Sequence, residues 1–282
     1  MEGTFTPSNL LLFLMQTMPD SVHSAPPGPA TPAASIALVT GATAGFGQAI
    51  SRALLQAGWR VIGTGRRADR LAALRAQWPE AFWPLAFDVA DRAAAQGALT
   101  SLPAAWQDVD LLVNNAGLAL GLGRADQASL DDWDRMIDTN IRGLATLTRL
   151  LLPQMVRRNR GYVINIGSIA GNWPYPGGNV YGATKAFVKQ FSQNLRADLA
   201  GTAIRVSNVE PGLCGGTEFS NVRFKGDDER AASVYAGVQA ISPEDIARIV
   251  LWLVQQPPHV NVNRIEVMPV AQSFAPLSVA RG

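Results

Sequence analysis

Short apolar runs alternate with longer amphipathic stretches along this chain from residue 36 to residue 267. The runs are five to seven residues long and rich in Val, Ile and Leu, which is typical of strands buried on both faces of a parallel sheet. They occupy residues 36–40, 59–65, 82–87, 109–113, 162–166, 203–209 and 262–267. Apolar residues at helical spacing lie between them, most clearly in residues 48–57, 68–78, 133–157 and 243–256. This alternation predicts a single α/β domain, doubly wound, with a seven-stranded parallel sheet and right-handed crossovers.

The first 34 residues differ in composition from everything that follows. They are rich in proline and poor in charge, so they cannot bury enough apolar surface to order themselves. We therefore expect residues 1–34 to be a disordered extension and residues 35–282 to form the domain. The apolar run from Leu10 to Met15 is too short to span a bilayer and lacks the basic start of a signal peptide. Two alternatives stay open: this run docks on the domain as one helical turn, or translation starts at Met18.

Composition and charge narrow the possible functions. The formal net charge is +2 over 282 residues, with neither a basic patch nor an acidic tail, so we expect no nucleic-acid partner and no membrane partner. The single cysteine, Cys214, excludes an internal disulfide and suits a reducing compartment. With only two histidines and one cysteine, we expect no metal site.

A glycine-rich loop lies between the first predicted strand and the first predicted helix. Its residues are Gly41, Ala42, Thr43, Ala44, Gly45, Phe46 and Gly47. A strand, a glycine loop and a helix in this order place the backbone N–H groups of a helix N-terminus around a pyrophosphate. The alternative is a tight turn that needs glycine for close packing. The loop predicts dinucleotide binding in a Rossmann-type domain.

Arg66 and Arg67 close the second predicted strand, where many dinucleotide-binding domains carry an acidic residue for the ribose 2′-hydroxyl. No Asp or Glu occurs between Gly41 and Arg67. Because a guanidinium group matches a phosphate bidentately, the pair predicts NADP rather than NAD. The alternative is a solvated arginine pair at a strand end.

Two further strand ends carry candidate cofactor contacts. Asp88 and Val89 follow the third strand, where the Asp side chain either reaches the adenine or caps the next helix. Asn115, Ala116 and Gly117 follow the fourth strand, and their small size leaves room for the adenosine ribose. Asparagine side chains also tie neighbouring strand ends together, and this structural alternative stays open.

Tyr181 and Lys185 are four residues apart, so on a helix their side chains share one face. An ammonium group beside a phenol favours the phenolate and lowers its pKa from about 10, which suits a general acid and base near neutral pH. Ser168 follows the fifth strand, where its hydroxyl can face this tyrosine. Asn140 sits inside the predicted helix 133–157, either as one polar position or as the mark of a helix distortion whose free carbonyl holds a water near Lys185.

From Ile36 onward the chain resembles the classical short-chain dehydrogenase/reductases. The resemblance rests on Thr40-Gly41-x-x-x-Gly45-x-Gly47, Asn114-Asn115-Ala116-Gly117, Asn140, Ser168, Tyr181-x-x-x-Lys185 and Pro211-Gly212, in the family's order and near its spacings. Within the family the chain looks most like the NADP-dependent 3-hydroxy acid dehydrogenases. The matching segments are 114–121, 173–175 and 210–227.

This resemblance implies specific roles for the matching residues. Tyr181 exchanges the proton of the substrate hydroxyl, Lys185 assists it and binds the nicotinamide ribose, Ser168 orients the substrate, and Asn140 holds a proton-relay water. Pro211, Gly212 and Thr217 are implied to contact the cofactor. In the charged segment that follows, Arg223 and Lys225 are candidates for binding a substrate carboxylate, and two alternatives stay open: backbone N–H groups near Gly215 bind it, or both cations are solvated surface charges.

The group also implies a cytoplasmic homotetramer acting on L-allo-threonine, serine or 3-hydroxypropionate, the last in exchange with malonic semialdehyde. One alternative is an NADPH-dependent reductase of other small ketones or aldehydes. Another is a non-catalytic NADP(H)-binding sensor, which would be expected to lack Tyr181, Lys185 or Ser168. The apolar tail after Met268, with Pro276, Leu277 and Val279, either packs across a subunit interface or frays.

Overall fold

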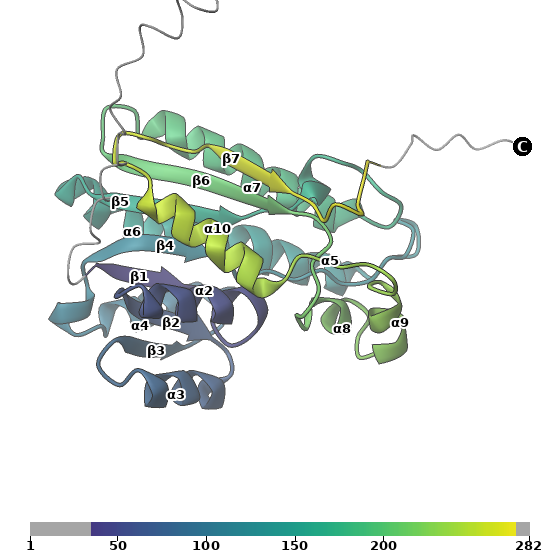
Figure 1. Cartoon of the computed structure of the whole chain (residues 1–282), viewed down its shortest axis with the longest axis horizontal. Coiled ribbons are helices and arrows are strands. Elements are labelled where there is room, and N and C mark those ends of the chain that lie inside the picture. The colour runs from purple at the N-terminus through teal and green to yellow at the C-terminus, as the bar shows by residue number, and fades with distance from the viewer. Residues whose placement is uncertain (1–34, 275–282) are drawn as a thin grey trace, which may run out of the picture. The chain divides into compact units, whose positions relative to one another are not determined.

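The computed structural model describes residues 35–274, so the predictions for residues 1–34 and for Pro276, Leu277 and Val279 lie outside it. Its sheet has seven strands, all parallel, in the order β3-β2-β1-β4-β5-β6-β7. The strands are β1 (Ile36–Val39), β2 (Arg60–Gly65), β3 (Phe82–Ala86), β4 (Val109–Asn114), β5 (Gly161–Ile166), β6 (Ile204–Pro211) and β7 (Arg264–Val267). The predicted doubly wound sheet is confirmed (Figure 1).

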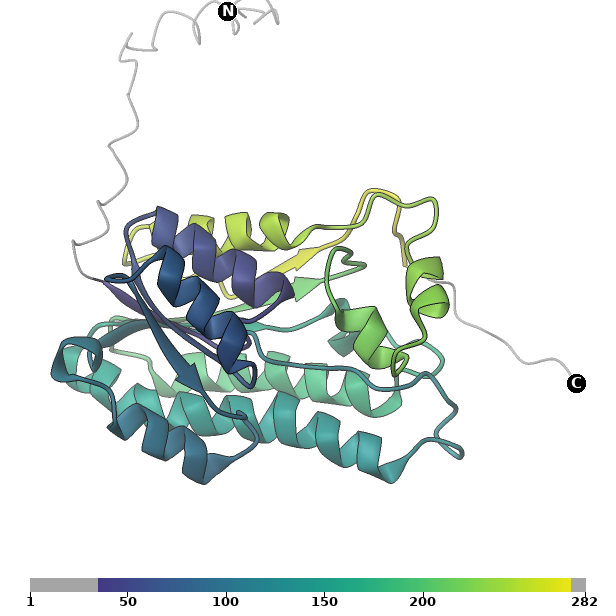
Figure 2. The ribbon, with the colours of Figure 1, turned by 90° about the horizontal axis from the view of Figure 1, so that it is seen from below.

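Helices cover both faces of the sheet, as Figure 2 shows. Apolar side chains of α2, α3 and α10 pack with the sheet in one core, and those of α4, α6 and α7 pack with it in a second core. Burial on both faces explains why the inner strands are apolar runs, whereas the edge strand β7 alternates charged and apolar residues and has no buried residue. The helices are α2 (Gly45–Gln56), α3 (Ala68–Gln77), α4 (Arg92–Thr100), α5 (Leu130–Ile137), α6 (Leu144–Arg158), α7 (Asn179–Asp198), α8 (Phe219–Arg223), α9 (Asp228–Ser233) and α10 (Pro243–Gln255).

The sheet has its topological switch point between β1 and β4. The chain proceeds from β1 outward to β3, then returns across the sheet to pair β4 with the other side of β1. Connections on either side of this point lead away from each other, which leaves a crevice at the carboxyl ends of the strands. The Thr40 hydroxyl fixes the crevice floor, because it accepts bonds from the backbone N–H groups of Asn115 (2.9 Å) and Ala116 (2.8 Å).

The predicted helix 133–157 is three segments in the structure. A π-helical stretch, Asp138–Gly143, separates α5 from α6. The π geometry shifts the backbone hydrogen bonds by one residue and is common at functional sites. Asn140 lies in this stretch, so the helix distortion that was one of its two interpretations is present.

Several predicted element boundaries shift by a few residues. The first helix begins at Gly45, inside the glycine loop, rather than at residue 48, and the last strand begins at Arg264 rather than at residue 262. The start of α10 is as expected, because Ser242 caps it and Pro243 occupies its first turn. Among residues 35–274, no helix has the length and apolar character needed to cross a membrane.

Candidate active site

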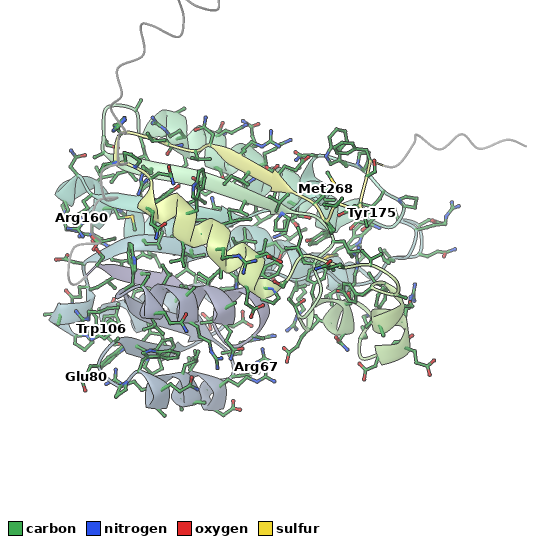
Figure 3. The ribbon with its side chains drawn as sticks, in the orientation of Figure 1. Arg67, Glu80, Trp106, Arg160, Tyr175 and Met268 are labelled. Atoms are coloured by element: carbon green, nitrogen blue, oxygen red, sulfur yellow. The ribbon has the colours of Figure 1, made fainter. Side chains whose placement is uncertain are left out.

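One large cavity of about 1170 Å³ lies at the carboxyl edge of the sheet. Figure 3 locates this edge: Arg67, Tyr175 and Met268, which line the cavity, lie to the right, whereas Trp106, Arg160 and Glu80 lie to the left. Nearly all the residues predicted for the site line it. They are Gly41, Thr43, Ala44, Gly45, Phe46, Arg66, Arg67, Asp88, Val89, Asn115, Ala116, Gly117, Ser168, Tyr181, Lys185, Pro211, Gly212, Thr217 and Arg223.

The glycine loop has the backbone that an anion-binding turn needs. Gly41 (φ +68°) and Gly45 (φ +49°) adopt left-handed conformations that other residues rarely take. Helix α2 has no side-chain cap and no acidic residue in its first turn, so its N–H groups face no competing anion there. Gly47 is not among the residues that line the cavity, and an added Cβ there would stand 2.2 Å from the Gly41 carbonyl oxygen. Close packing therefore accounts for glycine at position 47, and its predicted cofactor contact stays a prediction.

The two arginines at the end of β2 differ in their surroundings. Arg66 is 60% exposed and lies 3.8 Å from Asp88, its partner in an ion pair. Arg67 is held on both sides: its Nη2 donates to the Thr43 hydroxyl at 3.1 Å and its Nη1 to Glu218 at 2.7 Å. Arg70 also donates to Glu218, at 2.9 Å. Partial burial raises the pKa of the Glu218 carboxyl, but the bonds from Arg67 and Arg70 outweigh this effect and hold the pKa below its usual value.

At the end of β4 the Asn115 side chain takes its structural alternative, whereas at the end of β3 Asp88 does not cap the next helix; both residues line the cavity. Asp88 accepts from the Ala90 N–H at 3.0 Å, and Asp91 is the residue that caps α4. Asn115 donates to the Thr40 carbonyl at 2.7 Å and so ties β4 to β1. Gly117 lies close to two of the predicted catalytic side chains, since an added Cβ there would lie 3.3 Å from Asn140 Oδ1 and 3.5 Å from Lys185 Nζ.

The three predicted catalytic residues that line the cavity follow or lie beside β5. They are Ser168, Tyr181 and Lys185. Ser168 follows β5, and its hydroxyl accepts from the Ala170 N–H at 3.1 Å and faces the Pro211 carbonyl at 3.4 Å. Tyr181 and Lys185, on α7, are 8% and 7% exposed. The Lys185 ammonium donates to the Ile166 carbonyl at 2.8 Å and lies 5.9 Å from the centre of the Tyr181 ring.

The electrostatics of this group correct one expectation. Burial raises the pKa of the Tyr181 phenol well above 10, whereas hydrogen bonding with Ser168 and the charge of Arg223 act in the opposite direction. The predicted lowering of this pKa by Lys185 is not found, because the ammonium is directed at Ile166 at the end of β5. Burial also lowers the pKa of the Lys185 ammonium to about 8.

This burial of Lys185 predicts a measurable dependence of stability on pH. Between pH 8 and about 10.4, the unfolded chain keeps the Lys185 proton while the folded protein has lost it, so raising the pH favours the folded state. The shift from 10.5 to about 8 corresponds to roughly 3 kcal/mol. Lys185→Met is expected to remove this contribution. The melting temperatures of cofactor-free wild type and variant, followed by circular dichroism, should converge from pH 8 to pH 10.

The comparison isolates one group, because Tyr162, Tyr181 and Cys214, whose pKa values burial raises, titrate in both proteins. Parallel melting curves for wild type and Lys185→Met across this range would show that Lys185 is charged in the folded state.

Asn140 is buried and its side chain is fully used. Its Oδ1 accepts from the Leu118 N–H at 2.9 Å, and its Nδ2 donates to the Leu118 carbonyl at 2.8 Å and to Thr184 at 3.0 Å. The side chain therefore fixes the loop after β4 against α7. Asn140 is not among the residues that line the cavity, and the relay water on its backbone carbonyl in the π-helix stays a prediction.

The segment after β6 lines the cavity through α8, and both α8 and α9 lie beyond the strand ends in Figure 1. Thr217 lies directly over the glycine loop, since a Cβ on Gly45 would stand 3.1 Å from its methyl group. Arg223 donates to the Tyr175 hydroxyl at 2.7 Å and lies 5.6 Å from the Tyr181 ring centre. Lys225 is paired with Asp132 at 2.8 Å and lines a smaller neighbouring cavity, which corrects its candidacy as a carboxylate ligand in the main one.

Two groups of lining residues escape sequence reasoning. Glu218, which lines the cavity, forms ion pairs with Arg70 and Arg67, which lie 148 and 151 residues away in the sequence, and no local pattern signals such pairs. The segment 268–274, expected to be part of an apolar tail, lines the cavity through Met268, Gln272 and Phe274. Gln272 is the anchor, because its amide oxygen accepts from the Leu213 N–H at 2.7 Å.

Residues 35–228 match the sequence model of a protein family described as short chain dehydrogenase. The chain belongs to the short chain dehydrogenase family.

Named relatives of this short chain dehydrogenase are similar over most of its length. A "Probable NADP-dependent dehydrogenase" of Haemophilus influenzae is 71% identical over 245 residues, 87% of this chain and 97% of its own. An "NADP-dependent 3-hydroxy acid dehydrogenase YdfG" of Salmonella typhi is 61% identical over 246 residues, 87% of this chain and 99% of its own. A solved structure, "The Closed form of serine dehydrogenase complexed with NADP+", has a TM-score of 0.87 at 58% identity and covers 88% of this chain and 100% of its own.

Proposed function

We propose that this short chain dehydrogenase transfers hydride between NADP and a short 3-hydroxy acid of the L-allo-threonine, serine or 3-hydroxypropionate type. The observation that carries the proposal is one cavity with two chemically distinct ends. The glycine loop and two arginines lie at one end, and Ser168, Tyr181 and Lys185 lie at the other. The names of the relatives, which include 3-hydroxy acid and serine dehydrogenases, support this substrate class.

The cavity fits a dinucleotide cofactor. The uncapped N-terminus of α2 and the left-handed glycines offer N–H groups for a pyrophosphate, and Arg66 and Arg67 offer cations for a 2′-phosphate. Lys185, whose ammonium donates to the Ile166 carbonyl at the end of β5, is the proposed ligand of the nicotinamide ribose. Bound NADP supplies the hydride chemistry, and the chain supplies binding, orientation and proton transfer.

The chain's own residues account for the proton. In the oxidative direction, Tyr181 accepts the proton of the substrate hydroxyl, and in the reductive direction it donates that proton to the carbonyl oxygen. The Ser168 hydroxyl orients the substrate oxygen, and such alignment supplies much of the rate. In the proposed relay, Lys185 passes the proton to a water that the backbone carbonyl of Asn140 holds, and this water releases the proton to solvent. Because burial keeps the phenol protonated at neutral pH, the described state suits the reductive direction.

Arg223 is the proposed ligand of the substrate carboxylate. It lines the cavity beside Tyr181, and its bond to Tyr175 directs the guanidinium inward. Arg223→Ala is expected to lower kcat/KM for a 3-hydroxy acid by roughly 10- to 100-fold, the value of one charge-assisted hydrogen bond. The methyl ester of the same acid should lose far less, and steady-state kinetics on both substrates measures the difference.

Lys225→Ala is the matched control, because this cation is two residues away and is bound to Asp132. An Arg223→Ala enzyme that keeps the wild-type preference for acid over ester removes Arg223 from the proposal.

The second candidate function is reduction of other small ketones or aldehydes with NADPH. Apolar side chains in the cavity, among them Leu213, Phe219 and Met268, favour it. A screen that follows NADPH absorbance with hydroxy acids, aldehydes and ketones separates the candidates. The proposal expects the highest kcat/KM for short 3-hydroxy acids. A better neutral carbonyl substrate would favour the second candidate, and cofactor binding without any turnover would favour a sensor.

Two further properties belong to the proposal. We infer a homotetramer and cytoplasmic residence from the resemblance to the 3-hydroxy acid dehydrogenase group. The single cysteine, suited to a reducing compartment, supports the second. Light scattering after gel filtration tests the tetramer, and fractionation of the source cell tests the location.

A further inference from the structure

The turn that carries Ser168 is packed tightly against the helix of the catalytic pair. Ser168 caps the short 3-10 turn Ile169–Gly171. A Cβ on Gly171 would stand 2.6 Å from the Lys185 carbonyl carbon, so the turn touches the α7 backbone directly. Asn172 closes the turn, because its N–H donates to the Ile169 carbonyl at 2.9 Å. The position of Ser168 therefore depends on what holds Asn172.

The Asn172 side chain is bound by three other elements. Its Nδ2 donates to Glu210 on β6 at 2.7 Å and to Glu266 on β7 at 2.8 Å. Its Oδ1 accepts from Lys189 on α7 at 2.8 Å. An amide with both ends bonded in this way has one orientation available, which is how a positioned residue keeps its neighbours in place.

Glu210 is a buried carboxylate without a place in the proposed proton path. It is 1% exposed and accepts from Arg264 at 2.9 and 2.6 Å and from Asn208 at 2.6 Å. The next residue is Pro211, whose carbonyl faces the Ser168 hydroxyl at 3.4 Å. Glu210 thus holds the Ser168 turn through its bond with Asn172. It also holds the end of β6, where the Pro211 carbonyl faces the Ser168 hydroxyl.

We propose that Asn172, bound to Glu210, is a positioning residue that holds the Ser168 hydroxyl against Tyr181. This inference rests on the proposed roles of Ser168 and Tyr181. Neither Asn172 nor Glu210 lines the cavity, so their effect on the reaction passes through Ser168. Hydrogen bonding with Ser168 lowers the pKa of Tyr181, and this gives the proposal a readout beyond rate.

The test compares Asn172→Ala, Asn172→Asp and Ser168→Ala in the oxidative direction. Asn172→Ala is expected to lower kcat about tenfold, to leave the KM for NADP within twofold and to raise the kinetic pKa of kcat, as Ser168→Ala does. Asn172→Asp keeps the shape of the side chain but places a third carboxylate beside Glu210 and Glu266. The decrease in kcat should therefore be larger for Asn172→Asp than for Asn172→Ala. The other polar groups around Tyr181, which are Tyr175, Arg223, Cys214 and Lys185, are the same in every variant.

The double variant Ser168→Ala/Asn172→Ala separates positioning from general damage. If Asn172 acts through Ser168, the double variant is as slow as Ser168→Ala alone. Ser207→Ala is the control for lost stability, because Ser207 is a fully buried residue of the same strand β6 that bonds Tyr162 at 2.6 Å. It should lower the melting temperature without moving the kinetic pKa.

The outcomes distinguish this inference from the proposed function. Asn172 variants that lose stability but keep the wild-type kcat and kinetic pKa overturn the inference, as does full additivity with Ser168→Ala. If Ser168→Ala itself keeps the wild-type kcat, the catalytic role proposed for Ser168 fails instead.

Discussion

Tyr181→Phe is expected to lower kcat by roughly 10²- to 10⁴-fold, the contribution of a positioned general acid and base. The phenol oxygen is the only part removed, and it is the atom that exchanges the substrate proton in the proposed mechanism. The ring remains in the apolar cluster with Ala119 and Met136, so the fold is expected to persist. Initial rates in both directions, followed by NADPH absorbance, measure the loss.

Tyr175→Phe is the matched control, because Tyr175 lines the same cavity and bonds Arg223 rather than Ser168. It should raise the KM for a 3-hydroxy acid and leave kcat within a few fold. NADPH fluorescence must show that Tyr181→Phe still binds cofactor. A variant that binds cofactor and keeps near-wild-type kcat ends the assignment of Tyr181.

The presence of seven parallel strands could be predicted from the sequence because the position of each strand follows from local signals. A strand buried on both faces is largely apolar, so the inner strands β1, β4 and β5 are visible as runs of Val, Ile and Leu. The glycines after β1 and the pair Tyr181 and Lys185 lie at fixed spacings next to these runs. Because all strands are parallel, residues that follow them gather at one edge, and the predicted residues accordingly share one cavity.

The properties that escaped prediction depend on packing between distant segments. The direction of the Lys185 ammonium is set by the Ile166 carbonyl, and the Tyr181 pKa is set chiefly by burial, which spacing on a helix does not reveal. Gly47 matches the family motif but serves packing against Gly41. Contacts such as Arg67 with Glu218 and Gln272 with Leu213 join segments more than 50 residues apart, and no periodicity encodes them.

The difference between Arg66 and Arg67 leads to the second large expected effect. Arg66→Ala is expected to raise the KM for NADP by roughly 10- to 100-fold, because one charge-assisted bond to a phosphate is lost, and to change the KM for NAD little. Arg67→Ala should raise the KM for NADP at least as much. This substitution also removes one of the two ion pairs of Glu218, so that Arg70 is the remaining partner of the carboxylate among residues 35–274. That partly freed negative charge opposes a 2′-phosphate.

Arg70→Ala tests the same cluster without removing a predicted phosphate ligand. Arg70 shares Glu218 with Arg67, so its loss frees part of the same carboxylate, and only a small rise in the KM for NADP is expected. Steady-state kinetics on the three variants gives the change in KM for NADP relative to the change in KM for NAD, and this ratio tests whether the arginines bind the 2′-phosphate. Equal changes for the two cofactors in Arg66→Ala and Arg67→Ala would mean that the pair does not read the 2′-phosphate, and the preference for NADP would then have to arise elsewhere in the cavity.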